Sequence, residues 1–140
     1  MNREEKIKKL IKVAYKYLGK PYRYGAKPSQ APREFDCSSF VQYLYKRIGV
    51  KLPRTALEQA SAGKIVKPNL RNLKPGDLVF IKGGWGHYNP GFTEGIGHVA
   101  LYVGNGKVVN ARGEAGKVVE EKAAEFLERK DFRVVKRILV

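Results

Sequence analysis

Apolar residues in the first third of the chain recur at helical spacing in two segments. Residues 7–18 carry an apolar stripe at intervals of three and four positions, and Gly19 with Pro21 supplies a stop. A second stripe covers residues 40–48, and Gly49 ends it. The sequence therefore predicts two amphipathic helices near the N-terminus, joined by a proline-containing loop.

The second half of the chain shows the alternation and the turn signals that are typical of strands. The tripeptide Gly104-Asn105-Gly106 is a tight hairpin signal. Strands are predicted at 78–82, 99–103, 107–111 and 132–140, with a brief pairing at 118–119, helices at 55–60 and 121–130, and an exposed basic stretch at 64–74. Because helices come first and strands follow, the pattern favours one α+β domain over residues 1–140, with an antiparallel sheet.

The only cysteine, Cys37, lies where the loop gives way to the second helix. A helix start directs unpaired backbone N–H groups and the positive end of the helix dipole at the sulfur, which favours the reactive thiolate. The alternative is an inert buried cysteine, which is common for this residue type. The polar neighbours Asp36, Ser38 and Ser39 are unusual for a core and favour a reactive thiol. Cys37 is therefore a candidate nucleophile.

A candidate base and a candidate orienting residue follow on the two strands of the predicted hairpin. His98 begins the apolar run at 98–103, and Asn110 lies in the strand at 107–111. Each has an ordinary alternative, as a strand-end histidine or a turn asparagine. A cysteine, a histidine and a polar residue in this order are used in acyl-transfer chemistry. We expect the Cys37 helix to pack on the sheet that carries the other two.

The segment 83–97 is rich in glycine, which predicts that much of it is irregular. Its larger side chains are interleaved with these glycines: Trp85, His87, Tyr88 and Phe92. This is the composition of a ligand-facing loop. We expect the segment to form one wall of a substrate groove beside His98, and the alternative is that its aromatic rings cover the edge of the sheet.

The charge balance is strongly positive, with 28 Lys and Arg against 13 Asp and Glu, or +15. Such a surface attracts polyanions such as nucleic acid, anionic lipid or cell-wall polymer, or it is simply the solvated face of surface helices. No basic recognition helix or stacking-aromatic signature is present, so we expect no specific nucleic-acid binding. A polyanion-binding module without catalysis stays open as an alternative.

Cysteine and histidine usage makes metal and disulfide chemistry poor candidates. One Cys with two His at unrelated spacings predicts no metal site, and no cofactor is expected. A single cysteine excludes an internal disulfide. No apolar run approaches the roughly 20 residues of a bilayer span, so we expect no transmembrane segment, and no export signal is visible.

Five motifs follow one another between residues 14 and 111. They are Gly19-Lys20-Pro21-Tyr22-Arg23-Tyr24-Gly25, Asp36-Cys37-Ser38-Ser39-Phe40-Val41, Leu52-Pro53-Arg54-Thr55-Ala56 with Gln59, Leu73-Lys74-Pro75-Gly76-Asp77-Leu78-Val79-Phe80, and His98-Val99-Ala100-Leu101-Tyr102-Val103-Gly104-Asn105-Gly106. In this order and spacing the chain resembles the NlpC family of papain-like cysteine endopeptidases. The resemblance implies a papain-like fold, in which a helical part bearing the cysteine packs on a small antiparallel β-sheet or barrel. It also implies hydrolysis of the stem peptides of bacterial peptidoglycan, commonly at a γ-D-glutamyl to diamino acid bond.

Carried over by position, the resemblance makes Cys37 the nucleophile, His98 the base and Asn110 the orienting residue. Asn110 stands where many members have histidine. An asparagine oxygen serves the same purpose, because the role is to accept a hydrogen bond from the imidazole N–H.

The resemblance also assigns substrate contacts. Tyr24 lines the site and helps to hold the oxyanion, and Asp36 and Ser38 match positions that contact the free amine of a trimmed stem peptide in some members. Ser39 replaces the usual glycine, which would crowd the backbone where the substrate approaches. Trp85 and His87 are the loop residues that we expect at the groove.

Two further readings keep the thiol chemistry but change the substrate or setting. One is acyl transfer to an acceptor other than water, or amidase action on a different substrate. The other is a toxin or effector with the same reaction. For the endopeptidase, we expect a monomer in the cell envelope or secreted, which binds stem peptides and, through its basic surface, anionic wall polymers.

Overall fold

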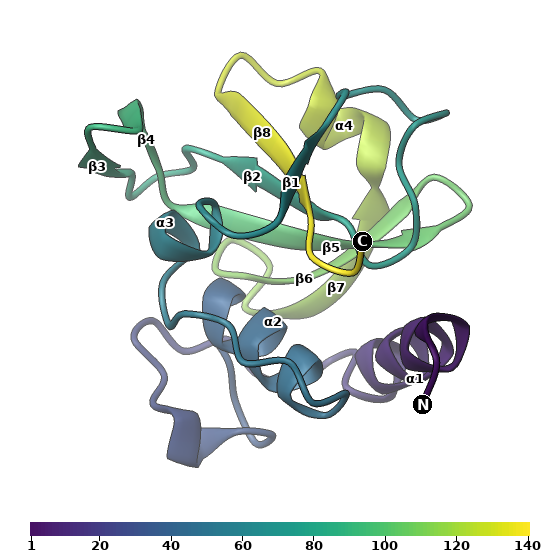
Figure 1. Ribbon diagram of the computed structural model, residues 1–140. Coiled ribbons are helices and arrows are strands. Elements are labelled where there is room, and N and C mark those ends of the chain that lie inside the picture. The colour runs from purple at the N-terminus through teal and green to yellow at the C-terminus, as the bar shows by residue number, and fades with distance from the viewer.

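An antiparallel sheet of six strands forms the centre of the computed structural model, which describes residues 1–140 (Figure 1). The strand order is β1-β8-β2-β5-β6-β7, and β3 pairs only with β4 in a separate hairpin. The strands are β1 (Lys64–Val66), β2 (Leu78–Ile81), β3 (His87–Asn89), β4 (Phe92–Ile96), β5 (His98–Gly104), β6 (Lys107–Arg112), β7 (Lys117–Lys122) and β8 (Phe132–Arg137). The α+β class predicted from the sequence is confirmed.

Helices cover both faces of this sheet. They are α1 (Arg3–Lys16), the short 3-10 helix η1 (Pro28–Gln30), α2 (Cys37–Lys46), α3 (Ala56–Gln59) and α4 (Ala123–Leu127). In Figure 1, α1 and α2 lie on one side of the sheet and α4 lies on the other. None of the helices combines the length and the apolar character that a membrane crossing requires.

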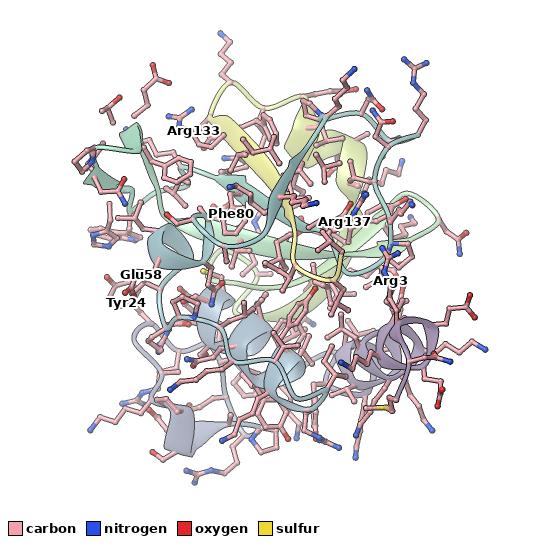
Figure 2. The ribbon with its side chains drawn as sticks, in the orientation of Figure 1. Arg3, Tyr24, Glu58, Phe80, Arg133 and Arg137 are labelled. Carbon is pink, nitrogen blue, oxygen red and sulfur yellow. The ribbon has the colours of Figure 1, made fainter.

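Alternation along the strands divides the core into two clusters. Leu78 and Phe80 of β2 pack with α1 and α2 in a cluster of 23 buried residues. Val79 and Ile81, on the opposite face, pack with α4 in a cluster of 10. Phe80 lies near the middle of the molecule in Figure 2. The helix that carries Cys37 therefore rests on a buried sheet, which gives it a rigid support.

Several predicted boundaries are wrong, and each error comes from strand pairing. The segment 83–97 holds the hairpin β3–β4 rather than being largely irregular, and the basic stretch at 64–74 contains β1. The pairing at 118–119 extends over all of β7, which takes in Glu121 and Lys122, so the predicted helix begins only at Ala123. The partner strand is distant in the sequence only for β1, which pairs with β8; β3–β4 and β6–β7 are hairpins between neighbouring strands.

Candidate active site

Cys37 is the first residue of α2, and a capping box fixes the start of that helix. The Asp36 side chain accepts a hydrogen bond from the Ser39 N–H at 2.8 Å, and the Asp36 N–H donates to Ser39 Oγ at 2.9 Å. Cys37 is 7% exposed as a residue, and its Sγ donates to the carbonyl of Gly97 at 3.8 Å. The candidate nucleophile Cys37 therefore contacts Gly97, the residue that precedes His98.

A half-buried arginine clamps the residues around the thiol. The Arg54 guanidinium donates to Asp36 Oδ2 at 2.7 Å and to Asp36 Oδ1 at 3.2 Å, and its Nη1 also donates to Ser38 Oγ at 2.8 Å. A further donation reaches the carbonyl of Ala26. Bidentate arginine–carboxylate pairs are strong and geometrically specific, so Arg54 holds the helix cap and the loop before it in one arrangement.

His98 and Asn110 meet across the β5–β6 hairpin, as the sequence predicted. The distance between His98 Nε2 and Asn110 Oδ1 is 2.7 Å, and the Asn110 side chain is completely buried. The hairpin turn forms because Asn105 and Gly106 both adopt positive φ, at 54° and 72°. An acceptor at Nε2 leaves Nδ1 as the ring nitrogen available for proton transfer.

Burial favours the neutral form of both the Cys37 thiol and the His98 imidazole. It raises the pKa of Cys37 to about 11, and the Asp36 carboxylate adds to the increase, whereas hydrogen bonds with the backbone of Val99 and Ser38 oppose it. Burial likewise lowers the pKa of His98, against the hydrogen bond to Asn110, which raises it. Desolvation therefore opposes the thiolate that a helix start favours.

Two cavities of about 580 and 320 Å³ adjoin at the site. His98 lines the larger and Cys37 the smaller, and both are lined by Tyr22, Tyr24, Trp85 and Gly97. The rings of Tyr24 and Trp85 lie 6.2 Å apart at an interplanar angle of 51°. Both rings are largely exposed, and Tyr24 lies at the edge of the molecule in Figure 2. The two cavities share these lining residues and are together called the cleft.

Most of the predicted site residues line this cleft. Asp36, Ser38 and His87 line the cavity of Cys37, and Trp85 lines both cavities. The segment after β2 therefore forms a wall of the cleft, as we expected.

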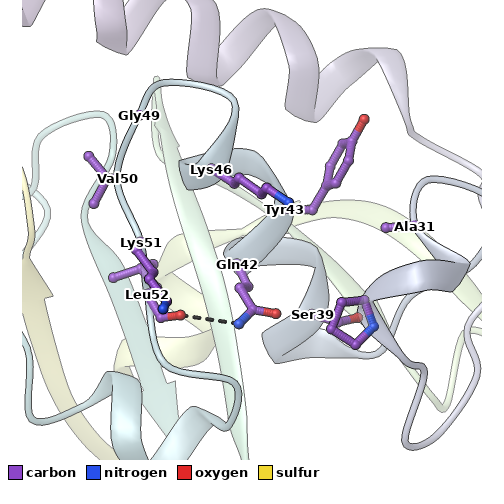
Figure 3. A pocket seen from close by; sticks show the side chains of 10 residues that line it. Ala31, Ser39, Gln42, Tyr43, Lys46, Gly49, Val50, Lys51 and Leu52 are labelled. Carbon is purple, nitrogen blue, oxygen red and sulfur yellow. Dashed lines mark hydrogen bonds between the residues drawn. The ribbon is translucent and has the colours of Figure 1, made fainter.

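Ser39 is not brought to the cleft. It lines a separate cavity of about 420 Å³ on the outer side of α2, with Gln42, Tyr43 and Lys46 (Figure 3). Its hydroxyl serves the capping box instead. A serine in place of glycine at this position therefore does not crowd the cleft.

Three residues at the site were missed by the sequence reasoning. Tyr22 lines both cavities. The pKa of its hydroxyl is raised to about 12, mainly by burial and secondly by the neighbouring Cys37. Tyr22 stood inside the same quoted motif as Tyr24 without a role. Arg54 stood inside a quoted motif without a role. Glu121, which accepts from Asn110 Nδ2 at 2.9 Å, had no local signal.

The structure places a cysteine at a helix start in contact with Gly97, next to His98, and His98 pairs with Asn110 on an antiparallel sheet. The NlpC/P60 family model matches residues 19–137, and the chain belongs to this family. The chain is 41% identical over 104 residues to "Probable endopeptidase p60" of Listeria welshimeri, which covers 74% of this chain and 17% of that protein. It is 36% identical over 104 residues to "Gamma-DL-glutamyl hydrolase" of Bacillus subtilis, covering 73% of this chain and 22% of that protein.

A solved structure agrees with the sequence matches. The chain is 36% identical over 127 residues to "Peptidoglycan endopeptidase RipB" of Mycobacterium tuberculosis, covering 84% of this chain and 48% of that protein. The RipB structure superposes with a TM-score of 0.76 at 30% identity, covering all of this chain and 69% of that one. The chain thus spans less than a fifth of the length of p60 and about half of RipB.

Proposed function

We propose that the chain is a cysteine endopeptidase that hydrolyses an amide bond in the stem peptides of bacterial peptidoglycan. The observation that carries the proposal is the convergence of Cys37 on the segment that bears His98, with Asn110 2.7 Å behind the imidazole. Relatives named for peptidoglycan endopeptidase and γ-DL-glutamyl hydrolase activity support the substrate class. We extend this to the γ-D-glutamyl to diamino acid bond.

In the proposed reaction, Nδ1 of His98 takes the proton of the Cys37 thiol as the sulfur attacks the peptide carbonyl. The imidazolium then protonates the departing amine, which leaves an acyl-enzyme. His98 next removes a proton from water, which attacks the thioester and releases the acid and the free thiol.

An oxyanion site is available beside the sulfur. The Cys37 N–H, at the first position of α2, has no hydrogen-bond partner within the protein. We propose that this N–H and the Tyr24 hydroxyl receive the developing negative charge. Asp36 and Ser38 already bind Arg54, so a substrate amine would join an existing Asp36–Arg54 pair rather than an isolated carboxylate.

The test is mass spectrometry of purified muropeptides after incubation with wild type and Cys37→Ala. We expect wild type to cut one stem-peptide bond and the variant to lose activity by about a thousandfold or more while staying folded. Equal cleavage by both proteins would remove the thiol mechanism. An added amine that appears in the product would instead indicate acyl transfer, and rapid alkylation of Cys37 without any cleavage would point to another acyl substrate.

We further propose that the basic surface holds the enzyme on anionic wall polymers. Every ion pair in the structure uses arginine as its cation, so the lysines are left unpaired. Free lysines suit a diffuse electrostatic contact, which salt screens. Co-sedimentation with purified walls should fall steeply between about 50 and 500 mM salt, and salt-independent binding would exclude this role.

The remaining proposals concern domain organisation, oligomeric state and location. We propose that residues 1–140 act as one catalytic domain, a monomer working in the cell envelope or secreted. Relatives of this chain are named as a peptidoglycan endopeptidase and a muramidase/DL-endopeptidase, and a substrate shared with them supports that location. Size-exclusion chromatography with light scattering tests the monomer.

A further inference from the structure

A chain of largely buried polar groups continues behind the His98–Asn110 pair. Asn110 Nδ2 donates to Glu121 Oε2 at 2.9 Å and to the Val119 carbonyl at 3.4 Å. The other oxygen of the Glu121 carboxylate accepts a hydrogen bond from Arg112 Nη1. Val119 lies directly opposite Asn110 in the β6–β7 register, and Glu121 lies two residues further along, on the same face.

This arrangement leaves the amide of Asn110 one workable orientation. A carboxylate and a carbonyl only accept hydrogen bonds, so the NH₂ end must face Glu121 and Val119. The oxygen end then faces His98 Nε2, which must carry the proton. In the neutral imidazole the lone pair therefore sits on Nδ1, where a base toward a thiol needs it.

Packing keeps the carboxylate in place. The Glu121 and Arg112 side chains are only 18% and 23% exposed. The Arg112 guanidinium lies 5.8 Å from the centre of the Phe126 ring, and the same ring stacks on His98 at 6.1 Å and 19°. Arg112 therefore holds the Glu121 carboxylate in place, and Phe126 limits rotation of both the guanidinium and the imidazole.

We propose that Glu121, held by Arg112, is a positioning residue that sets the amide orientation of Asn110 and, through it, the tautomer of His98. The catalytic part of this inference rests on the proposed function, because His98 needs its proton on Nε2 only if it acts as the base. The effect on the imidazole itself does not depend on which substrate is cut.

The decisive variant is Glu121→Gln, which keeps the shape of the side chain. The guanidinium of Arg112 will draw the oxygen of the introduced amide to itself, which turns the new NH₂ group toward Asn110 and favours a flipped Asn110 amide. Glu121→Asp retains an acceptor-only group and serves as the conservative rescue. Glu120→Gln is the matched control, because Glu120 is exposed on the same strand and bonds the Tyr15 hydroxyl instead.

Two readouts separate positioning from a general loss of structure. Long-range ¹⁵N–¹H NMR of the imidazole rings reports the tautomer directly, and the chain has only two histidines, so His87→Gln assigns the signals. Steady-state kinetics on a muropeptide separate kcat from KM. Thermal unfolding checks that each variant is folded at the measuring temperature.

We expect His98 to carry its proton on Nε2 in wild type, Glu120→Gln and Glu121→Asp, and to shift toward the Nδ1–H tautomer in Glu121→Gln. The kcat of Glu121→Gln should fall by at least about tenfold with KM nearly unchanged, as for the loss of an interaction that acts in the transition state. A folded Glu121→Gln that keeps the Nε2–H tautomer overturns the proposal, whatever its activity. A tautomer shift in a protein whose wild type cuts no muropeptide supports the positioning role and refutes the proposed function.

Discussion

Replacing Arg54 by methionine tests the clamp that holds the start of the nucleophile helix. The change keeps most of the aliphatic side chain and removes the guanidinium that binds Asp36 Oδ1 and Oδ2, Ser38 Oγ and the Ala26 carbonyl. The Asp36 carboxylate then loses its only cationic partner within 4 Å. We expect Arg54→Met to be destabilised, because a nearly buried carboxylate is left without compensation.

The magnitude follows from the burial of the pair. Exposed ion pairs contribute about 0–1 kcal/mol, and breaking a fully buried one costs about 3–5 kcal/mol. Arg54 and Asp36 are 30% and 11% exposed, between these limits, which suggests about 2–3 kcal/mol. For a chain of 140 residues, an unfolding entropy of about 2.1 cal/mol/K per residue converts this to a fall in Tm of about 7–10 °C.

Calorimetry on a double-mutant cycle measures the effect. Asp36→Asn keeps a good helix cap, so the cycle with Arg54→Met isolates the charge pair. Arg23→Met is the control, because Arg23 is 64% exposed and lies 3.9 Å from Glu34, and it should change stability by less than about 0.5 kcal/mol. A Tm of Arg54→Met within about 2 °C of wild type, or an absence of coupling in the cycle, would refute the reasoning.

Three further predictions concern the cleft. A Cβ on Gly97 would meet the carbonyl oxygens of Trp85 and Lys82 at 2.4 and 2.5 Å, so Gly97→Ala should lose about 1–3 kcal/mol of stability and most of its turnover. Gly84→Ala is the control, because a Cβ there meets nothing within 4 Å, and equal thermal unfolding and turnover of the two variants would contradict this prediction. Because the pKa of Cys37 is raised to about 11, its alkylation by iodoacetamide should keep accelerating from pH 8 to 10, and a plateau below pH 8 would show that the free protein already holds a thiolate. Trp85→Ala should raise KM about tenfold with little change in kcat, since it removes one cleft wall and no reacting group; an unchanged KM would mean that the substrate does not reach this ring.

The first two helices, the main hairpin and the reactive segment could be predicted from local pattern. The apolar stripes are set by helical periodicity, and the hairpin by a tripeptide that tolerates positive φ. The candidate nucleophile could be located because the only cysteine lies where a loop gives way to a helical apolar pattern. His98 and Asn110 could be placed on adjacent strands because a tight hairpin connects the two segments. These are short-range relations, so a single sequence contains them.

The tertiary structure alone decided the rest. Residues 64–66 form a strand because they pair with β8, near the other end of the chain. The protonation state of Cys37 depends on how much water the surrounding core excludes, and no neighbour in the sequence reports that. Glu121 reaches Asn110 through a cross-strand register between β6 and β7, and a shift of one residue would have turned it to the opposite face.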